Sequence, residues 1–165
     1  MTERIADYFV QLFAGKLSGE IIAFIVSLLP VSELRGGMIV AKLMDIPFLR
    51  AFIICFVANM IPVPFILLFI RRLFRLLKKN KRIRMFIEKI ESRGIEKGEK
   101  VKKYSLFGLF LLVAVPLPGT GAWTGALVAA LLDIRMKHSL PVIALGVLTA
   151  GLIMSALTYG LFSFA

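Results

Sequence analysis

Two uncharged, apolar stretches of the sequence are long enough to cross a lipid bilayer. Residues 51–70 and 139–165 contain no Asp, Glu, Lys or Arg, and a helix needs only about 20 apolar residues to span the hydrocarbon core. Hydrophobic residues make up 59% of the 165-residue chain, whereas roughly 45–50% is typical of water-soluble domains. The sequence therefore predicts an all-α integral membrane protein, with transmembrane helices over residues 49–77 and 138–165.

Most of the positive charge lies in residues 71–103. This segment contains 14 of the 21 Lys and Arg residues but only four of the ten Asp and Glu residues. Basic segments beside spanning helices stay on the cytoplasmic side, so we predict a multi-pass protein of the cytoplasmic membrane with this segment inside the cell. The basic residues are not interleaved with stacking aromatic residues, and no nucleic-acid partner is expected.

Two amphipathic stretches predict helices that lie in the membrane interface. Apolar side chains recur at helical spacing in residues 4–14 and again within the basic cytoplasmic segment, residues 78–103. The second stretch either anchors the topology or binds anionic lipid headgroups. Membrane lipids are the first partners that the sequence predicts.

Each spanning helix is preceded by two apolar arms that are too short to cross the membrane. In residues 19–46 the arms are separated by Pro30 and a charged Gly-Gly turn, and in residues 104–133 by a Pro-Leu-Pro-Gly-Thr-Gly sequence at 116–121. Proline lacks the N–H that a helix needs and glycine loosens the backbone, so a helix should break at both places. We predict two re-entrant helical hairpins. For residues 104–133, the alternative is one kinked span.

The two hairpins align with one another at an offset of 88 residues. Seven identities fall within eighteen positions, and they include Pro30 with Pro118, Gly37 with Gly125 and Asp45 with Asp133. One spanning helix follows each hairpin, so the second unit starts on the opposite side of the membrane from the first. This arrangement is an inverted-topology repeat, in which transporters bind substrate near the midplane where broken helices meet.

The hairpin tips contain the residues most suited to binding or coupling. Glu33 offers a carboxylate that can gain a proton when buried, and Arg35 offers a forked donor for phosphate or carboxylate. A mutual ion pair is the structural alternative. Backbone amides, hydroxyls and an indole add to these charges, and an acidic residue ends each hairpin. The remaining candidates are Gly36, Gly37, Asp45, Pro118, Gly119, Thr120, Gly121, Trp123, Thr124 and Asp133.

Catalytic machinery is not recognisable in the sequence. It contains no cluster of metal ligands, no nucleophile triad and no nucleotide-binding glycine loop. We therefore expect neither an enzyme nor a protein that needs a cofactor or a metal.

The segments 30–37 and 116–125 resemble the signature segments of the putative small multidrug export protein family, and the resemblance covers nearly the whole chain. That family is distantly similar to the DedA superfamily, whose members carry two re-entrant hairpins and include lipid scramblases and transporters of polyprenyl-phosphate carriers. The resemblance implies a role for acidic residues of the first hairpin, which falls on Glu33 and Asp45. DedA proteins also have arginines in the second hairpin. This sequence has none there, so phosphate recognition would require Arg35 to substitute.

Three functions follow from these observations. The leading hypothesis is a DedA-like transporter or flippase that moves an anionic amphiphile, such as a polyprenyl phosphate, between leaflets. The alternative is a proton-coupled small multidrug exporter, in which Glu33 binds the substrate cation. The third is a membrane scaffold that transports nothing. Because the chain is small, a homodimer is a further possible partner arrangement.

Overall fold

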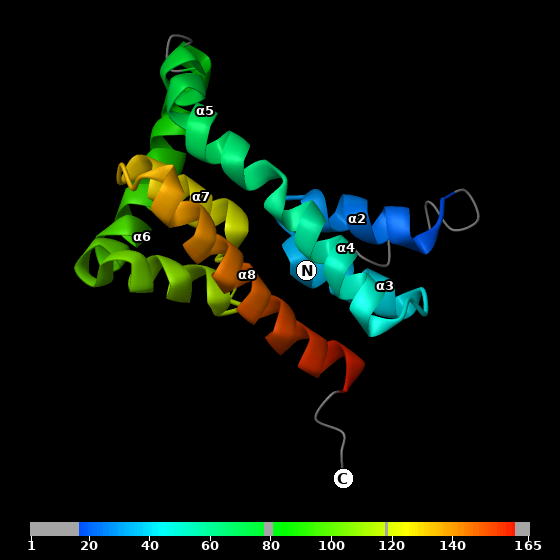
Figure 1. Cartoon of the computed structure of the whole chain (residues 1–165). Helices are drawn as coiled ribbons and strands as arrows, with labels where there is room; N and C mark the ends of the chain where they lie inside the picture. The colour runs from blue at the N-terminus through cyan, green and yellow to red at the C-terminus, as the bar shows by residue number, and fades with distance from the viewer. Residues whose placement is uncertain (1–16, 78–80, 118, 161–165) are drawn as a thin grey trace.

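The computed structural model describes residues 17–77, 81–117 and 119–160, which form helices and short connections without a β-strand (Figure 1). The interfacial helix that we predict at residues 4–14 lies outside this part of the chain. The helices are α2 (Gly19–Leu28), α3 (Glu33–Leu43), α4 (Phe48–Met60), α5 (Pro62–Leu77), α6 (Lys81–Ala114), α7 (Ala122–Leu131) and α8 (Met136–Tyr159).

Two helical segments have the length and composition of membrane spans. They are Phe48–Ile70, which comprises α4 and most of α5, and Met136–Tyr159, which is α8. Ile61 keeps helical backbone angles between α4 and α5, so the first segment is nearly continuous. The prediction of an all-helical protein with two helices of spanning length is confirmed.

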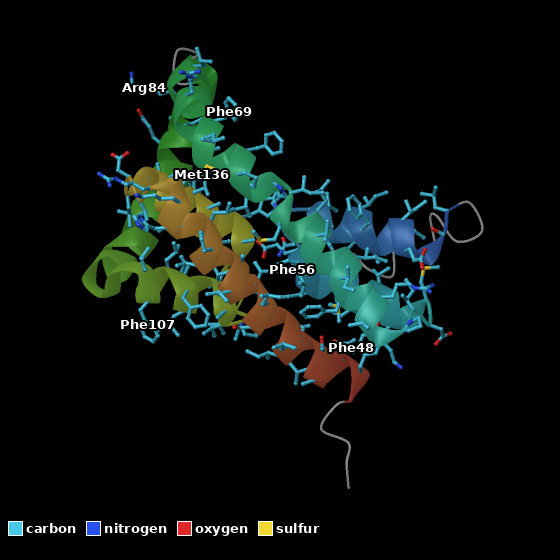
Figure 2. The ribbon with its side chains drawn as sticks, viewed as in Figure 1. Phe48, Phe56, Phe69, Arg84, Phe107 and Met136 are labelled. Carbon is cyan, nitrogen blue, oxygen red and sulfur yellow. The ribbon has the colours of Figure 1, made fainter. Side chains whose placement is uncertain are left out.

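Large apolar side chains cover the outside of the molecule. Leu49, Ile53, Val57 and Ile61 recur every four residues on one exposed face of α4, and Phe107 points outward from α6 (Figure 2). Soluble monomers rarely expose apolar patches of this extent, because water solvates them poorly. A hydrocarbon environment removes that cost.

The first hairpin is formed by α2 and α3, which pack against each other. Helix α2 ends because Leu29 precedes Pro30 and is forced into an extended conformation, with φ −72° and ψ 139°. Close packing of the arms depends on Gly37. A Cβ there would overlap Ser27 Oγ of α2 and lie 2.9 Å from Cys55 Sγ of α4.

The second hairpin is formed by the end of α6 and by α7, which also pack together. The helix break that the prolines and glycines predict is present, since α6 ends at Ala114 and α7 begins at Ala122. Gly125 occupies the position equivalent to Gly37, and a Cβ there would overlap Val113 of α6 and lie 3.7 Å from Ile143 of α8. Ile143 is the 88-residue equivalent of Cys55, so both glycines allow the same three-helix contact.

Both hairpins end in the same backbone turn. Asp45 and Asp133 have left-handed φ angles of 54° and 59°, and the next residues, Ile46 and Ile134, each donate an N–H five residues back at 2.9 Å. This pattern is a Schellman C-cap, and aspartate tolerates its left-handed position better than most residues. The two acidic residues thus have an observed structural role as helix terminators.

The two units also exchange packing partners. Helix α3 of the first unit packs on α8 of the second, while α7 of the second packs on α5 of the first, and α4 contacts α8. In Figure 1, α4 with α5 and α8 form two long diagonals whose chain directions are opposite. Helix α6 departs from the boundaries set from sequence, because it continues from the basic segment into the second hairpin without a break at residue 103. Good helix formers such as Glu, Lys and Arg dominate that stretch and sustain the helix.

The close packing at Gly37 generates the first prediction. Gly37→Ala should lower the stability of the detergent-purified protein by about 1–3 kcal/mol, the usual cost of overpacking. Ser27→Ala removes the oxygen that the new methyl group meets first. The double variant Ser27→Ala/Gly37→Ala should therefore unfold at a higher temperature than Gly37→Ala. Thermal unfolding followed by circular dichroism measures both, and equal melting temperatures for the single and double variants would contradict this packing.

Candidate functional site

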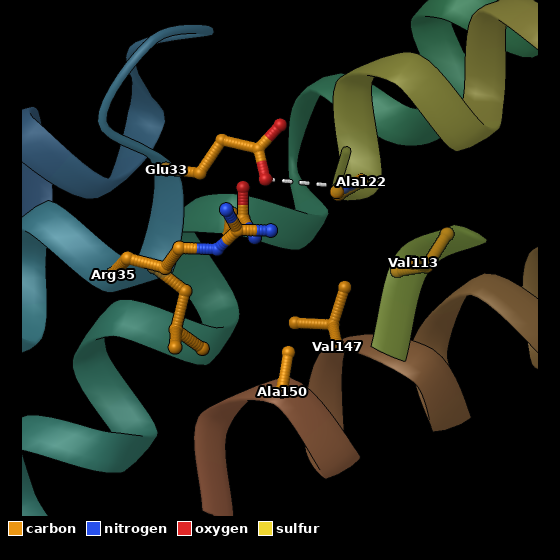
Figure 3. Close-up of a pocket in the computed structure, with 9 residues that line it drawn as sticks. Glu33, Arg35, Val113, Ala122, Val147 and Ala150 are labelled. Atoms are coloured by element: carbon orange, nitrogen blue, oxygen red, sulfur yellow. Dashed lines mark hydrogen bonds between the residues drawn. The ribbon is translucent and has the colours of Figure 1, made fainter. Parts of the chain in front are cut away.

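Glu33 joins the two hairpins. It begins α3, is 6% exposed, and accepts hydrogen bonds from the first two amides of α7, through Oε2 from Ala122 N–H and through Oε1 from Trp123 N–H, each at 3.2 Å. Figure 3 shows the carboxylate beside Ala122. A negative group at a helix N-terminus satisfies N–H groups that have no partner within the helix, and the helix dipole favours it. Glu33 is thus the cap of a helix in the second hairpin.

Unusual backbone geometry makes this contact. Glu33 has a φ of 51°, which is uncommon for a residue other than glycine, and Gly121 opposite it has a φ of 133°. A Cβ on Gly121 would overlap the Glu33 carboxylate. Glycine is therefore required at position 121 both for its backbone angle and for the space that the carboxylate fills. Strained positions of this kind cluster at functional sites.

Arg35 binds the second tip, which we define as residues 115–121. Its Nη1 donates to Leu117 O at 2.6 Å, and its Nη2 donates to Thr120 O and to Thr120 Oγ1, each at 3.1 Å. The guanidinium fork therefore spans two carbonyls of the break between α6 and α7, and Leu117 O also accepts the Thr120 N–H at 3.1 Å.

Thr120 organises the second tip from within. Its hydroxyl is within donating distance of two carbonyl oxygens, Val115 O at 2.8 Å and Leu117 O at 2.7 Å. The hydroxyl oxygen also accepts a hydrogen bond from Leu117 N–H at 3.2 Å. Thr124 Oγ1 donates to Gly119 O at 3.2 Å. These bonds hold the carbonyls in the positions that Arg35 contacts.

The charges of the first tip match the backbone dipoles of the second. Glu33 faces N–H groups and Arg35 faces C=O groups, so each charge meets the sign that stabilises it. Among the described residues no ion pair forms between Glu33 and Arg35, although both lie at the same tip. The mutual ion pair that the sequence left open is not the arrangement found. The two tips hold each other instead.

Two hollows share Glu33 and Arg35 as walls. The larger is a groove of about 500 Å³ between the tips, with apolar lining from Val31, Ile39 and Met154. The smaller is a cavity with room for about one water molecule, lined also by Asn59 and Val147. The residues that join the tips therefore line both the groove and the small cavity.

The remaining predicted site residues are dispersed. Thr124 and Gly119 line the groove, whereas Gly36 donates its N–H to Ser32 O and Gly37 is buried against α2. Trp123 contributes its backbone amide to Glu33. Asp45 and Asp133 lie at the far ends of α3 and α7 from the tips. Pro118 lies outside the described residues.

From the sequence, Asn59 with Pro62 and Pro64 either lines a cavity or kinks the first spanning helix, whereas Met154 is not singled out. Asn59 is 2% exposed on α4 and lines the small cavity, while Met154 of α8 lines the groove. The available signal for Asn59 was a lone amide within an uncharged run of spanning length. Methionine in an apolar helix gives no comparable signal.

The cap on α7 generates the second prediction. Glu33→Gln leaves one oxygen to accept two N–H groups and removes the charge, so it should lower stability by about 1–3 kcal/mol. The matched control is Glu20→Gln, which breaks the exposed 3.1 Å pair between Glu20 and Arg50. That change should cost at most about 1 kcal/mol. Thermal unfolding of the two variants under one condition makes the comparison, and equal losses would argue against the cap.

Comparison with known protein families identifies a match, and it covers most of the helices described above. The model of one family, described as putative small multi-drug export protein, matches residues 33–153, which include Glu33, Arg35, the second tip and most of both spanning helices. No curated protein and no solved structure matches the chain. With its two helices of spanning length, the protein is a membrane protein. Because the match covers more than half of the chain, the chain belongs to the family of putative small multi-drug export proteins.

Proposed function

We propose that the protein is a membrane transporter whose gate is the contact between its two hairpin tips. The observation that carries the proposal is the position of Glu33 and Arg35, which form walls of both the groove and the small cavity. Charged groups that line two neighbouring hollows are placed to control passage between them. Their bonds cross between units that are far apart in sequence, so the tips can part without unfolding either hairpin.

An inverted-topology repeat of two re-entrant hairpins is the architecture that we propose for this gate. Its support is the shared C-cap geometry at Asp45 and Asp133, the equivalent glycines at 37 and 125, and the opposite directions of the two spanning helices. Helix α3 of the first unit packs on α8 of the second, and α7 of the second packs on α5 of the first. A two-fold relation between the units would produce this pair of contacts. In such transporters, one unit rocks against the other around a fixed site.

The topology is testable by cysteine labelling. Two re-entrant hairpins with the basic segment in the cytoplasm put Ser92→Cys and Lys137→Cys on the cytoplasmic side and Arg50→Cys outside. A straight span between α6 and α8 would put Lys137→Cys outside. The native Cys55 is buried and should remain unlabelled. A membrane-impermeant maleimide applied to intact cells and to inverted vesicles makes the measurement, and labelling of Lys137→Cys in intact cells would contradict the two-hairpin topology.

We propose an anionic amphiphile, such as a polyprenyl phosphate, as the substrate. Glu33 already places an oxyanion at the N-terminus of α7, which is a favourable place for phosphate. When Glu33 gains a proton, its hold on the amides weakens, and a phosphate can replace it beside the Arg35 guanidinium. The apolar side of the groove leaves room for the tail. Transport in this scheme is coupled to protons because the substrate and the Glu33 carboxylate compete for one helix end.

Export of small cationic drugs is the second candidate, and the family description favours it. A cation would pair with the Glu33 carboxylate rather than replace it. Arg35 would add nothing to the affinity, because it repels the ligand.

Binding measurements separate the two substrates. For a short-chain polyprenyl phosphate, Glu33→Gln should strengthen binding, because glutamine mimics the protonated state of Glu33. Arg35→Ala should weaken phosphate binding about tenfold or more. Arg35→Lys should weaken it less, because lysine keeps the charge but loses the forked donor. Lower pH should favour phosphate binding to the natural protein more than to Glu33→Gln. For a lipophilic cation, Glu33→Gln should abolish binding and lower pH should weaken it.

The comparison with Glu33→Gln also controls for titration of the phosphate itself, which affects both proteins equally. Cation binding that requires Glu33, together with no phosphate binding, would favour drug export. Transport in reconstituted vesicles that survives both Glu33→Gln and Arg35→Ala would overturn the gate and leave the scaffold function.

A further inference from the structure

Asn59 is a buried amide without a partner in the described part of the chain. It lies on α4, in the middle of the first spanning segment, and is 2% exposed. Its Oδ1 accepts no hydrogen bond. An unsatisfied acceptor at that depth costs free energy, because no bulk water can reach it. The side chain therefore requires a partner.

Arg35 has the complementary deficit. Its two Nη atoms are bonded to the second tip, but its Nε is buried and donates to none of the described residues. Asn59 and Arg35 line the same small cavity. One group offers an N–H and the other an oxygen, so a molecule that both accepts and donates satisfies them together.

The cavity restricts what that molecule is. It has room for about one water-sized group, and Val113, Val147 and Ala150 form its apolar wall (Figure 3). The Arg35 charge disfavours a metal cation, and the size excludes phosphate or an organic ligand. A small neutral molecule that accepts one hydrogen bond and donates another fits both the charge and the size of the cavity.

We propose that a single buried water bridges Arg35 Nε to Asn59 Oδ1. The water accepts the Nε–H and donates to the amide oxygen, so Asn59 acts as a positioning residue for the guanidinium that holds the second tip. The inference rests on the proposed gate for its role in transport, because it connects a spanning helix to the tip contact. The water site itself depends only on the cavity and the two buried atoms.

A double-mutant cycle tests the bridge through thermal unfolding, which does not involve transport. Asn59→Leu replaces the amide with an apolar group of similar size and leaves Nε unpaired, so the melting temperature should fall by about 3–9 °C. In the Arg35→Ala background, the same substitution should have little effect, because the donor is already gone. Asn59→Asp keeps an oxygen in place and should retain most of the stability.

Ser155→Ala is the matched control, because Ser155 is a buried polar residue of α8 whose hydroxyl is already bonded to Gly151 O at 2.6 Å. Its effect should be the same with and without Arg35→Ala. Additive effects of Asn59→Leu and Arg35→Ala would overturn the bridge, as would an experimental structure with a dry cavity. If the stability effects of Asn59→Leu and Arg35→Ala are coupled but the protein shows no measurable transport, the bridge stands and the gate fails. Loss of transport in Asn59→Leu without coupling would contradict the bridge and leave the gate standing.

Discussion

The contact between the Glu33 carboxylate and the N-terminus of α7 is the interaction on which the arrangement of the hairpins depends. Two broken helices meet inside the molecule, and each break leaves backbone donors and acceptors without partners. In hydrocarbon such groups cost several kcal/mol each, so short helices are tolerated only where protein or water satisfies them. Glu33 supplies the acceptor for the amides and Arg35 the donors for the carbonyls. The charges of the first hairpin thus satisfy backbone groups of the second, and those backbone groups satisfy the charges.

The proposed inverted repeat accounts for where this contact lies. Glu33 and Gly121 are equivalent positions at the 88-residue offset, and both have a positive φ. In a structure with two-fold symmetry, a residue faces its own equivalent only close to the axis. Here one unit has a long carboxylate at that position and the other has no side chain, so the carboxylate of the first fills the space left by the second. Identical residues at both positions would either clash or leave a void.

Much of the architecture was readable from the sequence because its signals are local. Charge-free runs gave the spanning helices, and prolines with glycines gave the breaks. The self-alignment singled out Gly37 and Gly125, although their role in close packing appears only when the neighbouring helices are in place. The length of α6 is clear only in the structure, because a change in composition near residue 103 does not mark a helix end.

The partners of the tip residues were less accessible. Sequence analysis identified Glu33 and Arg35 but left open whether they pair with each other, and the observed bonds reach positions 82 to 90 residues away. Such contacts depend on how α3 and α7 are placed by α8 and α5. The role of Asn59 stayed open for the same reason, because an amide in an apolar run becomes informative only when its cavity and the Arg35 that shares it are known.

The tip contact also limits the ways in which the proposed gate can open. Parting the tips breaks the bonds of Glu33 and Arg35, and a hydrogen bond to a charged group contributes about 1.5–3 kcal/mol. Opening therefore requires replacement partners for an anion, a cation and a bare helix end at the same time. Water supplies them only if the groove hydrates fully. A proton on Glu33 removes the first requirement, and an anionic headgroup meets the other two. A substrate that lacks negative charge would leave Arg35 and the α7 amides unsatisfied in the open state, and this asymmetry is the physical reason to favour an anion.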